Sequence, residues 1–270
     1  MNKKIGFIGA GNMGGAIIGG IVRSEILSAK NIFVFDKNAE AAQKLNSEYG
    51  VNVCASVVDA VKTDIVFLAV KPNVIYTVIE EIKDCLSKDT VIVSIAAGQS
   101  IQKLTDAFDI HDIKLIRVMP NTPALVGEAM SALSLNAEMQ KEENKEAVSD
   151  VVSLLGSCGK AEIVSEKLMD TVTGVSGSSP AYIFMLIEAM ADAAVLGGMP
   201  RAQAYTFAAQ SVLGSAKMVL ETGKHPAELK DMVCSPAGTT IEAVKVLEDK
   251  NFRGTVIDAI DACIEKSKNL

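Results

Sequence analysis

The chain has few aromatic residues and no tryptophan. Of its 270 residues only 8 are Phe and 4 are Tyr, although 49% are hydrophobic. The interior must therefore be built from Ala, Val, Ile, Leu and Met, which favours helices packed closely on sheets or on one another. At this length the chain forms either one large domain or two unequal domains.

The chain also lacks an excess of positive charge and a cysteine framework. Its net charge is −7 and no Lys/Arg cluster stands out, so we expect no nucleic-acid partner. The five cysteines are scattered and contain no C-x-x-C pair, which argues against both disulfides and a zinc site. We therefore expect no metal and a cytoplasmic location.

An uncharged run from Ile5 to Val22 follows Lys3 and Lys4 and has the outline of a signal peptide or a membrane span. Its seven glycines argue against both, because each costs about 1 kcal/mol in a helix interior relative to Ala. They are Gly6, Gly9, Gly11, Gly14, Gly15, Gly19 and Gly20. We expect no membrane partner.

The same run fits a strand followed by a nucleotide-binding turn. KKIGFIG is an apolar strand, and GAGNMG at residues 9–14 matches G-x-G-x-x-G. The first glycine permits the tight turn, the second lets the backbone approach a pyrophosphate, and the third allows close helix packing. A second strand, NIFVF, ends at Asp36, where a carboxylate can hold a ribose 2′-hydroxyl, as in NAD sites. Lys37 beside it can instead meet a 2′-phosphate, and Asp36 can simply cap a helix.

Three further apolar strands follow, over residues 64–70, 90–96 and 114–119, separated by segments of helical length. This alternation predicts parallel βαβ units, with ligands beyond the carboxyl ends of the strands. Turns of small residues and prolines stand there, at residues 69–72, 96–98 and 119–124. Together they can frame a flat nicotinamide.

The C-terminal part reads as helices only. They are predicted over residues 166–174, 179–197, 200–222, 225–232, 239–249 and 253–268. We expect an α/β Rossmann-type domain with a mainly parallel sheet at residues 1–162 and an all-helical domain at residues 163–270. The 179–197 helix is apolar nearly all round, so an intertwined homodimer would bury it better than a single small bundle.

The turn Ser235–Thr240 precedes the helix predicted over residues 239–249. Because a helix mouth presents unpaired N–H donors, this turn is a candidate anion site. The alternative is an ordinary N-cap, in which Thr239 or Thr240 satisfies its own backbone.

No catalytic dyad is visible. His111 lies in a polar stretch, His225 precedes Pro226 and fits a helix cap, and Lys71 sits in a strand-end turn. This favours a substrate whose electrophile is already activated, such as a protonated imine.

The motifs together resemble the pyrroline-5-carboxylate reductase family. They are GFIGAGNMG, FLAVKP, SIAAG, RVMPNTPA, TGVSGSSPAYIF, HPAELKDMV and CSPAGTTI, in this order. The resemblance implies NADH- or NADPH-dependent reduction of 1-pyrroline-5-carboxylate to L-proline, the last step of proline synthesis. It also implies a helical domain that interlocks with its twin in a homodimer, which often assembles further, for example into a decamer.

By this resemblance, the substrate carboxylate binds at the 238–240 turn, where the Thr240 hydroxyl reaches the ligand as the catalytic-site residue. The expected substrate-binding residues are Ser176, Ser178, Pro180, Gly238, Thr239 and Thr240. The expected cofactor-binding residues are Gly9, Ala10, Gly11, Asn12, Met13, Gly14, Asp36, Lys37, Ser56, Ala69, Val70, Lys71, Pro72, Ala96, Ala97 and Asn121.

The chain departs from the family pattern in places. Asp36 stands where animal members use Ser, which tilts the preference toward NADH. Ser56 stands where members often carry Asn. In animal members an acidic residue contacts the substrate nitrogen. It aligns near Gly223 here, so this contact is not carried over.

Two rival functions share some of these features. A β-hydroxyacid dehydrogenase needs a lysine near the start of its interdomain helix, and SGSSPAYIFMLIEAM has none. A nucleotide-sensing protein without catalysis would be distinguished by the absence of turnover.

Overall fold

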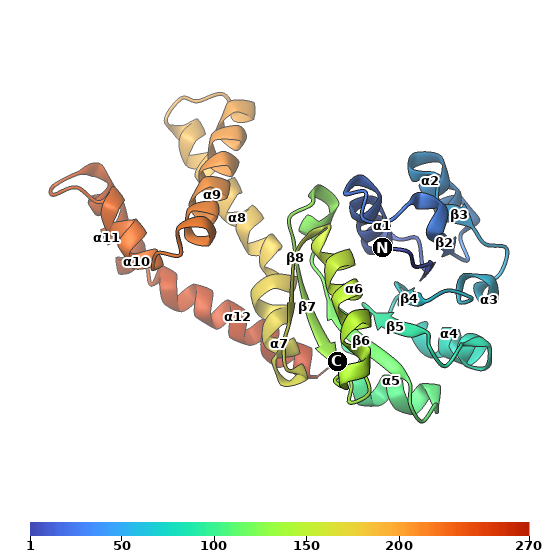
Figure 1. Cartoon of the computed structure of the whole chain (residues 1–270). Coiled ribbons are helices and arrows are strands. Elements are labelled where there is room, and N and C mark those ends of the chain that lie inside the picture. Colours follow the sequence, from blue (N-terminus) through green and yellow to red (C-terminus); the bar gives the residue numbers. More distant parts are fainter. Residues whose placement is uncertain (270) are drawn as a thin grey trace. The chain divides into compact units, whose positions relative to one another are not determined.

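An eight-stranded sheet organises the N-terminal part of the computed structural model, which describes residues 1–269 (Figure 1). Its spatial order is β3-β2-β1-β4-β5-β6-β7-β8. The strands are β1 (Ile5–Ile8), β2 (Ile32–Phe35), β3 (Asn52–Val53), β4 (Ile65–Leu68), β5 (Val91–Ser94), β6 (Lys114–Met119), β7 (Ala129–Leu135) and β8 (Gly159–Ile163). The chain order reverses at β1, between β2 and β4, where open α/β sheets bind their ligands.

The predicted Rossmann-type, mainly parallel sheet is confirmed. All pairings are parallel except that of β6 with β7. The sequence analysis did not predict β3, β7 or β8. β7 reads AMSALSL, whose small and hydroxyl side chains carry little strand signal, yet its residues are mostly buried, and Ala129 and Leu133 join the apolar core.

Helices cover both faces of the sheet. One apolar core joins β1 to α1 (Asn12–Arg23), α2 (Ala39–Tyr49) and α6 (Lys145–Gly156). The other joins β4 and β5 to α3 (Val57–Ala60), α4 (Ile75–Ile82) and α5 (Ile101–Phe108). Phe7 on β1 and Phe67 on β4 stack with ring centroids 4.6 Å apart. This rigid centre fixes the strand ends that carry the nucleotide turn.

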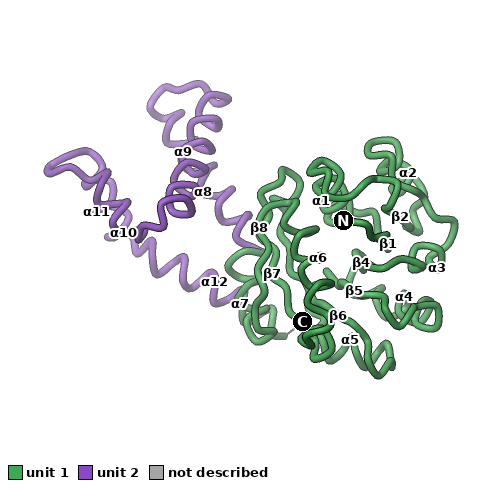
Figure 2. Tube along the Cα trace, viewed as in Figure 1, with its two compact units in different colours: residues 1–177, 264–270 green, residues 178–263 purple. Residues whose placement is uncertain are grey.

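The chain divides into two compact units, shown in Figure 2. The first is Met1–Gly177 with the chain from Ile264 onward, and the second is Ser178–Cys263. The first unit thus extends beyond residue 162, the predicted domain boundary. The reason is that the following segment packs on the sheet: Glu166 Oε1 accepts hydrogen bonds from the Ile101 amide (2.6 Å) and from Arg117 (3.0 Å).

Five of the six helices predicted for the C-terminal part are present in the described residues. They are α8 (Ser179–Leu196), α9 (Arg201–Thr222), α10 (Pro226–Val233), α11 (Thr239–Asp249) and α12 (Phe252–Lys268). The segment expected as one helix over 166–174 is instead a 3₁₀ turn (Glu166–Leu168), the short α7 (Met169–Val172) and a π-helical turn (Thr173–Gly177).

The helices of the second unit leave much apolar surface uncovered. In α8 only Ala191 is buried, and Phe184 and Met185 are 63% and 68% exposed. On length and composition alone, the stretch Glu166–Leu196 could cross a membrane, with a mean hydropathy of 1.4. A helix of this kind needs a cover that the single chain does not supply.

Candidate functional site

The glycine turn after β1 has the shape that a dinucleotide requires. Gly9 has φ of 108°, and a Cβ there would lie 2.4 Å from the Ala69 carbonyl oxygen. A Cβ on Gly14 would lie 2.5 Å from the Gly9 carbonyl oxygen, so this glycine permits the close approach of α1. A Cβ on Gly11 would meet no atom within 4 Å, so its side faces open space. The turn therefore fits a pyrophosphate approaching Gly11 and the uncapped N-terminus of α1.

Asp36, at the carboxyl end of β2, is tied to this turn. Its Oδ2 accepts a hydrogen bond from the Ala10 amide at 2.6 Å, and its Oδ1 accepts one from the Asn38 amide at 2.8 Å. The carboxylate lines the pocket beside the turn. Of the two earlier interpretations of Asp36, a helix cap and a ribose ligand, the first does not hold for its side chain, because Asn38 caps α2 by accepting from Glu40.

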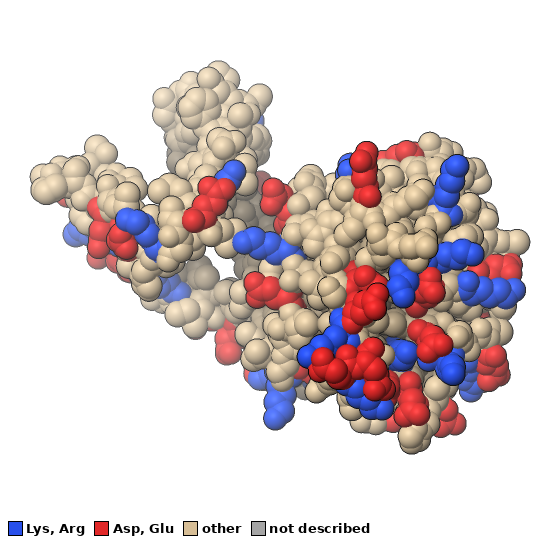
Figure 3. Space-filling model, in the orientation of Figure 1, with Lys and Arg blue, Asp and Glu red and all other residues tan. Residues whose placement is uncertain are grey.

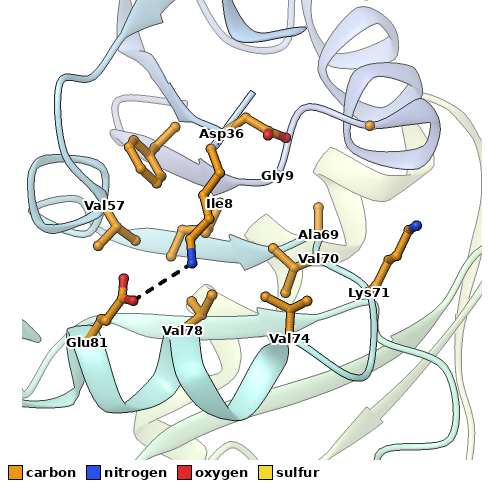
Figure 4. Close-up of a pocket in the computed structure, with 13 residues that line it drawn as sticks. Ile8, Gly9, Asp36, Val57, Ala69, Val70, Lys71, Val74, Val78 and Glu81 are labelled. Carbon is orange, nitrogen blue, oxygen red and sulfur yellow. Dashed lines mark ion pairs between the residues drawn. The ribbon is translucent and has the colours of Figure 1, made fainter. Parts of the chain in front are cut away.

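A pocket of about 290 Å³ opens at the carboxyl ends of β1, β2 and β4 (Figure 4). It is lined by Ile8, Gly9, Gly11, Phe35, Asp36, Lys37, Val57, Ala69, Val70, Lys71, Val74, Val78 and Glu81. Its walls are mainly apolar, as the flat base of an adenosine needs, and its charged groups lie at the rim.

Glu81 was missed in the sequence. It reaches the pocket from α4, where its Oε1 lies 4.0 Å from Lys37 Nζ (Figure 4, dashed line). Val74, Val78 and Glu81 line the same pocket at spacings of four and three residues, so they share one face of the helix. That spacing is the signal that could have identified Glu81.

The other predicted cofactor residues divide into two groups. Ala69, Val70 and Lys71 line the pocket. Ala96 is buried and Ala97 is exposed just after β5, and Pro72 follows Lys71; none of these three lines the pocket.

Ser56 caps α3: its hydroxyl accepts from the Asp59 amide at 3.2 Å and donates to the Asp59 carboxylate at 2.7 Å. Hydrogen bonding by Ser56 and Lys62 holds the pKa of Asp59 below its usual range.

Asn121 is buried and fully engaged. Its Nδ2 donates to the Ser176 carbonyl at 3.0 Å, and its Oδ1 accepts from the Met130 amide at 2.9 Å. Ser176 lies in the π-helical turn at the end of the first unit.

In the second unit, the 235–240 turn lacks a side-chain cap. Gly238 is the N-cap of α11, and within residues 1–269 neither Thr239 nor Thr240 makes a capping hydrogen bond. Thr239 is exposed and Thr240 half-buried. The first N–H groups of α11 are thus left for a ligand or solvent, and the structure gives no support to the N-cap alternative.

Ser178 and Pro180 stand at the start of α8. The Cys263 thiol donates to the Ser178 hydroxyl at 3.2 Å. Interaction with the same thiol, with a smaller effect of burial, raises the pKa of Tyr182. Ser178 thus belongs to a small polar cluster between the two ends of the unit's chain.

Both histidines make local contacts. His111 is exposed and pairs with Asp112 at 2.7 Å. His225 Nδ1 accepts from the Ala227 amide, which confirms its predicted role as the cap of α10.

Comparison with known proteins gives two matching family models. Residues 166–270 match one described as pyrroline-5-carboxylate reductase dimerisation, and residues 4–98 match one described as NADP oxidoreductase, coenzyme F420-dependent. The start of the first match lies closer to the predicted boundary at 162/163 than to the limit of the compact unit.

The relatives are similar over their whole length. The pyrroline-5-carboxylate reductase of Escherichia coli K12 is 53% identical over 271 residues, covering 100% of this chain and 99% of that protein. A solved pyrroline-5-carboxylate reductase from Coxiella burnetii is 32% identical, with a TM-score of 0.92 over 100% of this chain and 98% of that one. The Plasmodium falciparum enzyme, solved with NADP bound, is 33% identical, with a TM-score of 0.86 over 99% of this chain and 98% of that one.

Proposed function

The chain belongs to the pyrroline-5-carboxylate reductase family, and on this premise we propose how its residues share the reaction. It is an NAD(P)-dependent oxidoreductase of proline biosynthesis. The reduced nicotinamide supplies a hydride to the imine carbon of 1-pyrroline-5-carboxylate, which yields L-proline. The observation that carries this function is the full-length similarity, joined to a glycine turn whose Gly11 side is open to a pyrophosphate.

The dinucleotide is held by the first unit. The 9–14 turn and the N-terminus of α1 bind the pyrophosphate, and the rim formed by Asp36 and Lys37 holds the adenosine ribose. Ala69, Val70, Lys71 and Pro72 after β4, and Ala96 and Ala97 after β5, flank the rest of the cofactor. Ser56 supports this rim by capping α3, and its hydroxyl is already engaged with Asp59.

NADH is the preferred cofactor. The Asp36 carboxylate lies at the ribose position, where it accepts a hydrogen bond from a 2′-hydroxyl and repels a 2′-phosphate. Glu81 adds a second negative charge and pairs with Lys37, which otherwise attracts that phosphate. The P. falciparum enzyme was solved with NADP bound, so the preference proposed for this chain rests on its own Asp36 and Glu81.

The substrate carboxylate binds at the mouth of α11. Gly238 and Thr239 present backbone N–H groups there, and the Thr240 hydroxyl donates to the carboxylate. Ser176, Ser178 and Pro180 line the other side of the small ring. Holding the ring by its carboxylate orients the imine carbon, and orientation supplies most of what hydride transfer needs.

The proposed mechanism uses no metal and no histidine base. A protonated imine already carries the positive charge that a general acid would otherwise create. His225 is occupied as a helix cap and His111 as the partner of Asp112.

The chain forms a homo-oligomer through its dimerisation domain, residues 163–270 in our proposal. The exposed apolar face of α8 is the surface that the partner subunit covers. Contact with this partner, and not with a membrane, accounts for the apolar composition of the helix. Further assembly, for example into a decamer, and a cytoplasmic location stay predictions. We expect no nucleic-acid partner, because the net charge is −7 and, on the face in Figure 3, blue Lys/Arg atoms are interspersed with red Asp/Glu atoms.

The direct test is oxidation of NADH and of NADPH against a panel of cyclic imino acids. We expect turnover with 1-pyrroline-5-carboxylate, faster with NADH. Binding of dinucleotide without turnover of any imine would instead identify a nucleotide-sensing protein.

A further inference from the structure

Asn121 lies just after β6, at the edge of the sheet where we propose that the cofactor binds, and its side-chain amide hydrogen-bonds to the backbone of this chain. Asn121 is only 8% exposed, and both polar atoms of its side chain form hydrogen bonds with backbone groups. Oδ1 accepts from Met130 at the start of β7, and Nδ2 donates to the Ser176 carbonyl. Asn121 therefore ties the sheet to the segment that follows β8.

The segment held by this amide is a π-helical turn, Thr173–Gly177. Such turns are rare, and they persist where surrounding contacts fix them. A second contact comes from the same strand end: a Cβ on Gly177 would lie 2.7 Å from the Met119 methyl carbon. Met119 and Asn121 thus hold two successive residues of the turn, Gly177 by packing and Ser176 by hydrogen bonding.

We propose that Asn121 is a positioning residue for the substrate, acting through Ser176, and not a cofactor ligand. This rests on the proposed function, because it takes Ser176 as part of the substrate site. The donated hydrogen bond fixes the Ser176 backbone at the strand edge that faces the nicotinamide. Loss of the bond leaves the dinucleotide site intact, since the glycine turn follows β1 and Asp36 follows β2.

The chain offers a matched control in Asn136. It is 9% exposed, its Nδ2 donates to the Ile113 carbonyl at 2.7 Å, and its Oδ1 accepts from the Met139 amide at 3.0 Å. It therefore makes the same two kinds of bond, and its Oδ1 also accepts from the Leu115 amide at 3.4 Å. It makes them at the opposite end of β6, away from the ligand edge.

The experiment compares Asn121→Ala, Asn121→Asp and Asn136→Ala in the full chain. Measured quantities are the melting temperature, kcat and KM for 1-pyrroline-5-carboxylate, and the Kd of NADH without substrate. Asn121→Asp keeps an acceptor for Met130 and replaces the donor to Ser176 by a carboxylate oxygen, so it removes the bond in question and adds a negative charge. Asn121→Asp still provides the kinetic test if Asn121→Ala fails to fold.

We expect both Asn121 variants to lower kcat/KM for the imine by about 10- to 100-fold, chiefly through KM, with the Kd of NADH changed less than about twofold. Asn136→Ala should lose melting temperature but keep its kinetics. Normal imine kinetics in Asn121→Asp, or equal kinetic losses in Asn136→Ala, would overturn the proposal, and a weakened Kd of NADH would make Asn121 a cofactor ligand. Failure of the parent protein to reduce the imine would instead refute the proposed function.

Discussion

The Asp36 carboxylate accepts a hydrogen bond of 2.6 Å from the Ala10 amide in the glycine turn. One side chain at the end of β2 thus both carries the charge expected to select the cofactor and holds the turn expected to bind its pyrophosphate. A substitution that removes both carboxylate oxygens removes the charge and the anchor together. The two roles must therefore be separated by the choice of variant.

Asp36→Ser should shift the cofactor preference toward NADPH. Loss of a hydrogen bond from the ribose hydroxyl to a charged group costs roughly 1.5–3 kcal/mol, so kcat/KM with NADH should fall by about 10- to 150-fold. Because the Ala10 contact is lost as well, the gain with NADPH should be smaller than the loss with NADH. Steady-state kinetics with both cofactors measure this.

Asp36→Asn is the companion variant, since it removes the charge but keeps one oxygen that can accept from Ala10. We expect it to use NADPH better than Asp36→Ser does. A parent enzyme with a clear NADPH preference would contradict the role assigned to Asp36, and Lys37 would then be the residue to test.

Glu81→Gln should raise kcat/KM with NADPH and leave that with NADH nearly unchanged. The substitution frees Lys37, whose Nζ lies 4.0 Å from Glu81 Oε1, to meet a 2′-phosphate. Both side chains are well exposed, so the effect corresponds to about 0.2–1 kcal/mol, or up to about fivefold, and should shrink at high salt.

Glu80→Gln is the matched control for Glu81. It removes the same charge one residue earlier on α4, where Glu80 pairs with Lys83 and does not line the pocket. Equal changes in both variants would mean that only the overall charge of the helix matters, and Glu81 would have no specific role.

The local patterns of the sequence predicted the parallel strands, the glycine turn and five long helices, because each rests on periodicity or on a backbone requirement. The Gly9 and Gly14 contacts confirm the physical reasons given for those glycines. His225 was recognised as a cap from its place before Pro226, and the structure bears this out.

Long-range pairings could not be predicted in this way. The bond from Asn121 to Ser176 joins residues 55 apart, and that from Glu166 to Ile101 joins residues 65 apart. Neither leaves a signal in local composition. The limit of the first compact unit depends on such contacts. Side-chain hydrogen bonds hold the segment after β8 to the sheet, so the unit reaches Gly177 and does not end at residue 162.

Leu186→Lys or Met190→Lys should cause aggregation or unfolding and not yield a soluble active monomer. Both residues lie on α8 and are 37% and 36% exposed in the single chain, on the surface assigned to the partner. A lysine ammonium buried there without a partner charge is costly, and an obligate dimer has no stable folded monomer. Sedimentation of the purified variants measures the outcome.

Val53→Lys is the control for these variants, because Val53 is 40% exposed and lies on the edge strand of the first unit. It should leave the oligomer and its activity intact. A well-folded, active monomer from either α8 variant would refute the interlocked dimer, and recovery of the parent chain in detergent-extracted membranes would assign α8 to a bilayer.

Thr240→Ala should lower kcat/KM for the imine by about 10- to 150-fold, since a hydrogen bond to a charged group contributes roughly 1.5–3 kcal/mol. Thr240→Ser keeps the hydroxyl and should retain most activity. The Kd of NADH without substrate should barely change, because the glycine turn lies in the other unit. Steady-state kinetics and melting temperature are measured on the same preparations.

The competing explanation for Thr240 makes the opposite prediction. A threonine that only caps α11 would cost about 1 kcal/mol of stability on truncation and leave the kinetics of the folded enzyme normal. The N-cap of α11 is Gly238, with no side-chain capping bond among residues 1–269, so we expect little loss of stability. Thr206→Ala, which truncates an exposed threonine within α9, supplies the baseline for both measurements. Reduced melting temperature with unchanged kcat/KM would remove Thr240 from the substrate site and leave the backbone N–H groups of Gly238 and Thr239 as the carboxylate donors.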